Sequence, residues 1–255
     1  MTARPLAPTA KASTLALVKS YIERYAETHY RGMQVVKAQF NGSIASAAEI
    51  YPCLPQVPKN STDSITAYGR IGDKIKPLSL KVWGSVCLST ASYRRIRVRV
   101  LFLTAKSIKN AAQKSNIDIV HLINDGQTDG GVQFDGTVER RDFPINTNKF
   151  TVLSDRSYDL FQAGAVSVGG ATGPIGEEFP TFNNYDDNLS SAKHFSLDLT
   201  VPATLQYSVA TGNDPTNYYP FMVLGYTYYD GNAAPTSTPT EVTACVSSML
   251  KFDDA

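Results

Sequence analysis

Three arginines occupy alternate positions of one short segment, where Arg95, Arg97 and Arg99 are separated by apolar residues. A period of two is typical of a strand with one polar and one apolar face. Guanidinium groups that lie side by side repel one another unless carboxylates or phosphates neutralise them, and arginine binds both groups in bidentate geometry. The spacing therefore predicts either pairing with Asp or Glu on a neighbouring strand or subunit, or contact with nucleic acid. Of the two, we favour the pairing.

Basic residues are also more frequent near the N-terminus. Residues 1–40 carry six basic and two acidic side chains, a net charge of +4, whereas the whole chain carries +1. This segment is less basic than a histone-like tail, but its cations could neutralise phosphates without regard to base sequence. The candidate nucleic-acid contacts in it are Lys11, Lys19, Arg24, Arg31 and Lys37.

Two loop sequences resemble ligand-binding motifs without meeting their requirements. The glycines of residues 169–176 are followed by Pro180 and a polar run, whereas a phosphate-binding loop must open a helix. Asp125, Asp129 and Asp135 lie close together, but they lack the spacing and the terminal glutamate of a calcium loop. We expect a surface loop in the first case and solvated turns in the second. A calcium site between subunits is the alternative for the aspartates.

The histidines and tyrosines give no clear sign of catalysis. His29, His121 and His194 have no histidine or cysteine at the spacing of a metal site, and no nucleophile elbow is present. We therefore expect structural histidines, no metal, no other cofactor and no enzymatic activity. Tyrosines within residues 217–230 could form a stacking platform for sugars or bases, although a mixed core and interface role is the simpler interpretation.

Most of the chain has the pattern of short strands separated by loops rich in Gly, Pro, Asn and Asp. Helical spacing is confined to residues 14–30 and to a short helix expected around residues 105–123. The predicted strands span residues 78–88, 94–103, 149–160, 193–201, 204–210, 220–230 and 240–252. This pattern predicts a sandwich or barrel. Its expected core includes Trp83, Val98, Val152, Leu197 and Leu224.

Composition is consistent with one large β domain. Hydrophobic residues make up 42% of the 255 residues, which is enough for a substantial core. Three cysteines argue against a disulfide framework and favour a reducing compartment, with Cys87 in the core. No apolar run reaches the roughly 20 residues that a membrane span requires, so we expect no membrane insertion.

Several segments follow one another in an informative order. YGRIGDKIKPLSLKVWGSV (68–86) combines a basic run with an apolar strand, and RIRVRVLFLTAKS (95–107) is an arginine-bearing strand. NKFTVLSDRSYDL (148–160), KHFSLDLTV (193–201) and two final strands follow. Over roughly residues 64–254, this order resembles that of the capsid proteins of small circular single-stranded DNA viruses, a single jelly-roll family. These capsids commonly begin with a dense Arg/Lys arm, which the +4 segment matches poorly.

The resemblance implies an all-β fold, an eight-stranded antiparallel jelly-roll sandwich in residues 64–255. Residues 1–63 would form an N-terminal arm with a short helix. The implied protein is a structural component of the virion. Its copies self-assemble, in the host nucleus or cytoplasm, into a small icosahedral (T=1) shell around a single-stranded DNA genome, and a host cell receptor is a further implied partner.

Two other functions remain open. The capsid protein of a small or satellite RNA virus would share the same sandwich. A carbohydrate-binding jelly-roll lectin would use the tyrosines as its platform. An enzyme of the cupin kind would need clustered histidine ligands, which the sequence does not offer.

Overall fold

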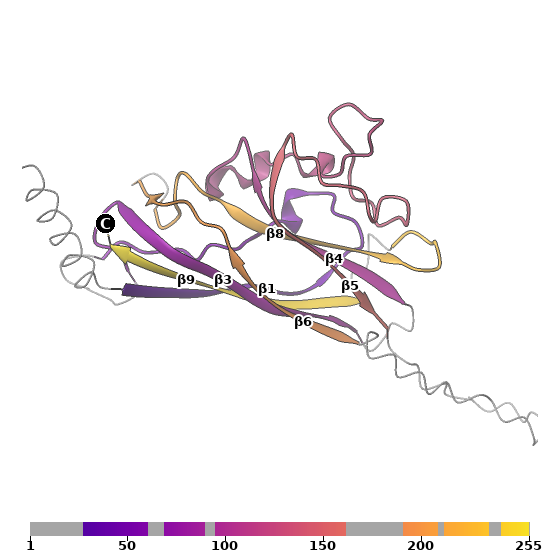
Figure 1. Cartoon of the computed structure of the whole chain (residues 1–255), viewed down its shortest axis with the longest axis horizontal. Helices are drawn as coiled ribbons and strands as arrows, with labels where there is room; N and C mark the ends of the chain where they lie inside the picture. Colours follow the sequence, from indigo (N-terminus) through magenta and orange to yellow (C-terminus); the bar gives the residue numbers. More distant parts are fainter. Residues whose placement is uncertain are drawn as a thin grey trace, which may run out of the picture.

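The computed structural model of the chain describes residues 28–60, 69–89, 95–161, 191–208, 212–234 and 241–254. Within these ranges the chain forms nine β-strands and three short 3-10 segments (Figure 1). The strands are β1 (Thr28–Phe40), β2 (Tyr51–Pro52), β3 (Lys74–Leu88), β4 (Ile96–Ala105), β5 (Phe150–Leu160), β6 (Ala192–Leu199), β7 (Leu205–Gln206), β8 (Pro220–Tyr228) and β9 (Val242–Asp254). The 3-10 segments are η1 (Ala47–Glu49), η2 (Ala111–Asn116) and η3 (Ile119–His121).

The strands form two antiparallel sheets packed as a β-sandwich. One sheet has the order β1-β9-β3-β6, with β7 paired to β3, and the other has the order β2-β8-β4-β5. Four of the pairings are nested along the chain: β1 with β9, β2 with β8, β3 with β6 and β4 with β5. The polypeptide therefore follows the path of one long antiparallel hairpin that has been rolled up into two layers.

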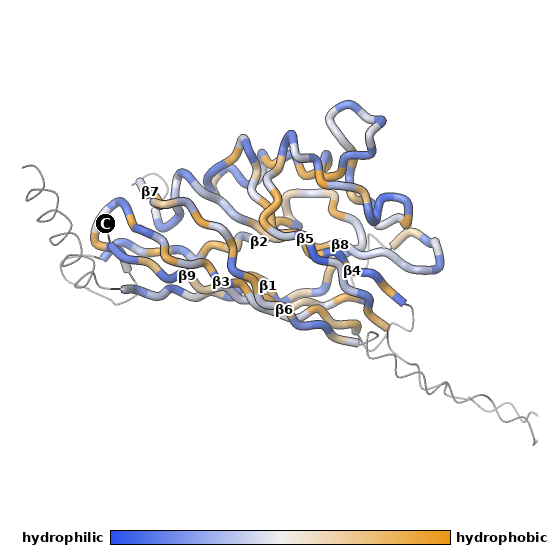
Figure 2. Tube along the Cα trace, viewed as in Figure 1, coloured by the Kyte–Doolittle hydropathy of each residue, from blue (hydrophilic) through white to orange (hydrophobic). Residues whose placement is uncertain are grey.

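The core between the sheets follows from the period of two along the strands. On β4, Ile96, Val98 and Val100 point inward and are almost fully buried. On the facing sheet, Leu80, Val82 and Val86 of β3 meet Val246, Leu250 and Phe252 of β9. The alternation of hydropathy along β3 and β9 is visible in Figure 2. Removing these alternate side chains from water supplies the main driving force for the packing of the two sheets.

A second core lies on the other face of the β2-β8-β4-β5 sheet. Leu101 and Leu103 of β4 and Phe221 and Val223 of β8 point to this side, where loop residues such as Phe134 cover them. Figure 1 shows the loops and short helical segments gathered over this sheet. The four-stranded sheet is thus buried on both faces, which explains why every residue of β8 is buried.

The predicted mostly-β sandwich is confirmed, and all seven predicted strand segments contain a strand of the structure. The predicted strand count of eight differs from the nine observed by one, the two-residue strand β7, which pairs with β3 beside the main path of its sheet. The helix expected around residues 105–123 takes the form of the short segments η2 and η3.

The N-terminal part of the sandwich was not predicted. Residues 28–40 form β1, which pairs along its length with β9, although the sequence placed residues 1–63 in an arm. The helix predicted for residues 14–30 is therefore wrong for residues 28–30, and the rest of it lies outside the described residues. A register shift between Gln34 and Val36 turns both Val35 and Val36 inward, which disturbs the period of two that would have marked the strand.

Burial differs from expectation at several core positions. Val98 and Leu224 are buried and Leu197 packs partly buried against the core, as predicted. Trp83 and Val152 are 40% and 38% exposed, because each points away from the space between the sheets. Cys87 shares the face of Trp83 on β3 and is only partly buried, contrary to the prediction.

Candidate functional site: two basic surfaces

The arginine-bearing strand is β4, and its polar face is turned toward the loop layer. Arg97 and Arg99 share this face with Leu101 and Leu103, so the face changes from basic to apolar along the strand. Strand β5 pairs with β4 on one side and supplies two aspartates. Asp159 lies opposite Arg97, and Asp155 lies two residues before Ser157, the residue opposite Arg99. The registers therefore place acidic groups beside the arginines.

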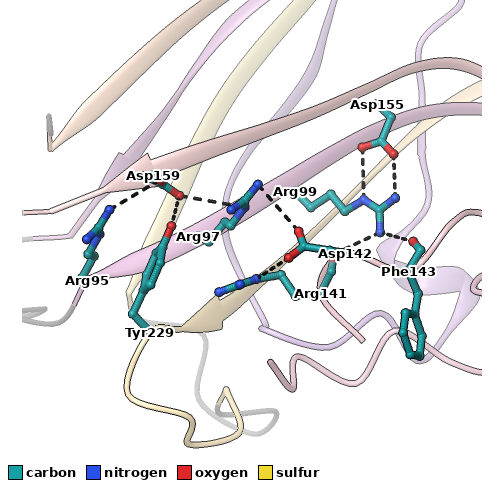
Figure 3. Close-up of polar contacts among 9 residues, drawn as sticks. All are labelled: Arg95, Arg97, Arg99, Arg141, Asp142, Phe143, Asp155, Asp159 and Tyr229. Carbon is teal, nitrogen blue, oxygen red and sulfur yellow. Dashed lines mark hydrogen bonds and ion pairs between the residues drawn. The ribbon is translucent and has the colours of Figure 1, made fainter. Parts of the chain in front are cut away.

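Arg99 forms the most buried of these ion pairs. Its Nε and Nη2 atoms donate to the two carboxylate oxygens of Asp155 at 3.1 and 2.6 Å, in the bidentate geometry expected of arginine (Figure 3). Its Nη1 atom donates to the backbone carbonyls of Arg141 and Phe143 at 3.1 and 2.8 Å. Only 7% of the Arg99 side chain is exposed. Arg99 therefore joins β5 to the loop that covers β4.

The other two arginines share one carboxylate near the end of the sheet. Asp159 lies 3.7 Å from Arg95 and 3.9 Å from Arg97, and it accepts a hydrogen bond from the Tyr229 hydroxyl (Figure 3). Arg97 also lies 3.6 Å from Asp142. The Arg95 guanidinium sits over the Tyr229 ring, 4.2 Å from its centroid, in a cation–π contact.

The arginine cluster is consequently almost neutral. Its cations are Arg95, Arg97, Arg99 and Arg141, and its anions are Asp142, Asp155 and Asp159. Burial, followed by the hydrogen bond to Asp159, raises the pKa of Tyr229, so this hydroxyl stays a donor at neutral pH. The geometry favours the pairing that the alternation predicted as the first of two alternatives. Contact between these arginines and nucleic acid stays a prediction.

The N-terminal candidates divide between described and undescribed residues. Lys11, Lys19 and Arg24 lie outside the described residues. Arg31 on β1 turns toward the segment after β2, and its Nε donates to the Gln56 carbonyl at 3.0 Å. Lys37 is exposed on the same strand, opposite Cys245 of β9. The structure therefore does not bring Arg31 and Lys37 into one cluster.

A second basic surface was missed at the sequence level. The outward side of the β1-β9-β3-β6 sheet carries Lys74, Lys76, Lys81 and Trp83 on β3, Tyr30 and Lys37 on β1, and Lys251 on β9. We call this surface the lysine face. Its signal was present in KIKPLSLKVW, where exposed lysines alternate with buried residues before the register shift after Pro77. Trp83 concealed it, because an aromatic residue in a strand suggested the core.

The aspartates considered as calcium ligands stabilise local turns. Asp125 accepts hydrogen bonds from the backbone of Gln127 and Thr128, and the Thr128 contacts in particular lower the pKa of its carboxyl group. Asp135 accepts from Thr137 and pairs with Arg140 at 2.9 Å. The glycine-rich residues 169–176 fall outside the described residues, as do Asp186 and Asp187, another pair of acidic residues in the sequence.

The histidines lie apart from one another. His29 is buried, stacks on Phe252 and lies 3.6 Å from Asp254, whereas His121 pairs with Asp118 at 2.7 Å. His194 is exposed on β6. Across the ranges that the structure describes, no three His, Cys, Asp or Glu side chains gather in a way that could hold a metal ion. In the same ranges, no helix is long and apolar enough to cross a membrane.

Of the five tyrosines proposed as a sugar platform, Tyr219, Tyr226 and Tyr228 are buried. Tyr226 is fully buried and Tyr228 is 4% exposed, and both point into the core between the sheets. Burial raises the pKa of Tyr226, with Glu241 as a smaller cause. These two rings are therefore not available at the surface for stacking on a ligand.

No family model matches the chain, and no curated protein matches it. The fold and the two basic surfaces are therefore the features that bear on the function of this chain.

Proposed function

We propose that this chain is a viral capsid protein with a jelly-roll fold, whose copies self-assemble into a closed icosahedral shell around a single-stranded DNA genome. The nested strand pairing carries the proposal. If the two-residue β7 is set aside, the eight remaining strands pair first with last, second with seventh, third with sixth and fourth with fifth. This is the pairing expected when an antiparallel ribbon rolls into the two four-stranded sheets of a jelly roll.

The strand positions also revise the comparison with the capsid family. The resemblance implies that residues 68–86 form the strand that opens the jelly roll and that residues 95–107 form its second strand. In the nested scheme β3 and β4 take the third and fourth places instead, because β1 and β2 precede them. The order of the later segments is unchanged. The order of segments therefore still resembles that of the capsid family, but the first two segments correspond to its third and fourth strands.

The two sides of the sandwich suit a shell wall. One sheet is covered by a thick loop layer, and the other presents lysines and aromatic rings. Protein shells need surfaces that meet identical copies, and symmetry multiplies modest contacts into a stable closed assembly. A genome inside the shell needs cations that neutralise phosphate charge, and the lysine face offers such cations.

The lectin alternative receives less support. Its platform was to be the tyrosines of residues 217–230, but Tyr226 and Tyr228 point into the core. The RNA-virus alternative uses the same fold and the same basic surface, so only the packaged nucleic acid distinguishes it from the DNA proposal.

The test is to express the full chain, purify it, and image it by negative-stain electron microscopy while recording the ratio of absorbance at 260 and 280 nm. Uniform closed particles with a raised ratio are expected. Digestion of the extracted nucleic acid with DNase or RNase then identifies its type. Small soluble species at every salt concentration and pH would overturn the proposal, and glycan binding by those species would favour the lectin.

A further inference from the structure

We propose that the lysine face of the β1-β9-β3-β6 sheet is a binding surface for single-stranded nucleic acid, with Trp83 as a stacking platform for a base. The inference rests on the proposed function in taking the packaged genome as the natural ligand. It differs from the sequence-based candidates, which lie in the N-terminal segment and on the arginine strand, in every residue but Lys37, which belongs to both sets. The charge, the exposure and the arrangement of side chains across the sheet support it.

The two basic surfaces differ in whether their cations are paired with carboxylates. The arginines of β4 and its surroundings are engaged by Asp142, Asp155 and Asp159. On the lysine face, no ion pair joins the exposed lysines to a carboxylate anywhere in the described ranges; these lysines are Lys37, Lys74, Lys76 and Lys81. Unpaired lysines on a strand are free to neutralise phosphates without first giving up an internal partner.

Acidic residues on this face are fewer than the lysines. Asp198 of β6 lies opposite Lys81, and Asp253 of β9 lies opposite Lys76. Asp253 accepts a hydrogen bond from Thr28, and Lys251 lies over the Tyr30 ring at 5.6 Å. The five lysines of the face therefore outnumber its two aspartates, which leaves a positive surface in a chain with a net charge of only +1.

Trp83 lies among small side chains that leave its ring uncovered. Its register partners are Ser247 of β9 on one side and Ser196 of β6 on the other, and Ser85 follows on the same face. The result is a large aromatic side chain that is 40% exposed near the middle of a sheet. Tyr30, on the same face, is 45% exposed. In the described part of the chain these are the two aromatic side chains exposed to this degree.

The combination fits a single strand better than a duplex. Lys81 precedes Trp83 by two residues on the same face, a separation of about 7 Å along a strand. Unpaired bases can stack on an exposed ring while their phosphates meet neighbouring cations, and such stacking tolerates any base. In a duplex the bases are already stacked on one another, so Trp83 would have no exposed base face to meet. The lysine face is therefore expected to discriminate by strandedness and not by sequence.

The chain contains its own probe, since Trp83 is its one tryptophan. Unassembled full-length protein is titrated with oligo(dT) of about 16 nucleotides, the upper site size of a single stacking module. Binding should quench Trp83 fluorescence, and a hairpin duplex of equal length should bind more weakly and quench less. Cys245, exposed on β9 next to Lys37 in the register, should react more slowly with maleimide in the presence of oligo(dT).

Matched variants separate this surface from general electrostatics. Lys76→Gln/Lys81→Gln should reduce the slope of log affinity against log salt by about 1.4, since each lost contact to a single strand contributes about 0.7. Lys106→Gln/Arg156→Gln removes two exposed cations on and next to the other sheet, neither of them a candidate contact, and should leave the slope unchanged. Trp83→Leu, measured by anisotropy of a labelled oligo(dT), should lower affinity about tenfold, which corresponds to the loss of stacking by one base.

The outcomes distinguish this inference from the capsid proposal. Binding without Trp83 quenching, equal binding of the duplex, or equal loss in the control variant would each overturn the lysine face as the site. If wild-type and Lys76→Gln/Lys81→Gln particles form and contain equal amounts of nucleic acid, the capsid proposal stands and this inference fails. If no particles form but oligo(dT) quenches Trp83 with the expected salt dependence, the inference stands and the capsid proposal fails.

Discussion

Removing Asp155 should destabilise the fold because it leaves the Arg99 guanidinium buried without its charge partner. Breaking a fully buried ion pair by deleting one member costs about 3–5 kcal/mol. Here the Asp155 side chain is 35% exposed, and Arg99 keeps its two hydrogen bonds to loop carbonyls. Water can therefore reach the vacated position, so we expect a loss of about 2 kcal/mol for Asp155→Ala, below the fully buried range.

A double-mutant cycle isolates the pair. In the Arg99→Met background there is no buried guanidinium, so Asp155→Ala should cost almost nothing, and the coupling energy should be about 2 kcal/mol. Arg95→Met is the matched control, because the Arg95 side chain is 45% exposed and 3.7 Å from Asp159. For such a surface pair we expect about 0.5 kcal/mol or less.

The assay is urea unfolding of unassembled protein followed by far-ultraviolet circular dichroism, at one protein concentration and one salt concentration. Two results would refute the reasoning. One is that Asp155→Ala lowers the free energy of unfolding by no more than Arg95→Met does. The other is that Asp155→Ala lowers it equally in wild-type protein and in the Arg99→Met variant. Either result would mean that the Arg99 pair behaves as a surface pair despite the burial of its guanidinium.

Three further predictions concern other parts of the molecule. Gly225→Ala should lower the free energy of unfolding by about 1–3 kcal/mol in urea, since a Cβ would meet the Phe134 ring at 2.5 Å and the Gly42 carbonyl at 2.9 Å; an unchanged midpoint would contradict this packing. The hydrogen bond from Lys149 lowers the pKa of Asp118, so this contribution to stability is present above about pH 4 and is lost as pH falls through the lowered value. Lys149→Met should raise the pKa of Asp118 in a carboxyl NMR titration, and an unmoved titration curve would count against the pair. With native protein and no nucleic acid, maleimide should label exposed Cys245 and spare Cys53, whose pKa is raised by burial; mass spectrometry of tryptic peptides reads both sites, and rapid labelling of Cys53 would show that the core is open.

The sequence by itself determined the class of fold. Alternating hydrophobic residues and loop-forming residues located the strands from β3 to β9, and Ile96, Val98 and Val100 were correctly placed on an inward face. These predictions succeed because a strand's period of two is a local property, which can be read from neighbouring residues. The same alternation showed that the arginines of β4 share a face and need partners.

The tertiary structure decided which carboxylates pair with the arginines of β4. Arg99 and Asp155 are 56 residues apart in the chain, and Thr28 and Asp253 are 225 apart, so only the strand registers bring them together. Strand β1 could not be recognised for a related reason. It is an edge strand with a bulge, so its residues do not alternate regularly, and its backbone pairing with β9 is what holds it in the sheet. Long-range pairing of this kind overrides local preference.

Tertiary structure also decided which polar surfaces are covered. The arginine strand and the lysine-bearing strand β3 both alternate basic and apolar residues, so their sequences look alike. The loop layer covers the outer face of the β4 sheet and supplies carbonyls to Arg99, whereas Trp83 stays 40% exposed on the outward face of the β3 sheet. The period of two shows that a strand has two faces, but which face meets another layer depends on segments distant in the sequence that fold over it.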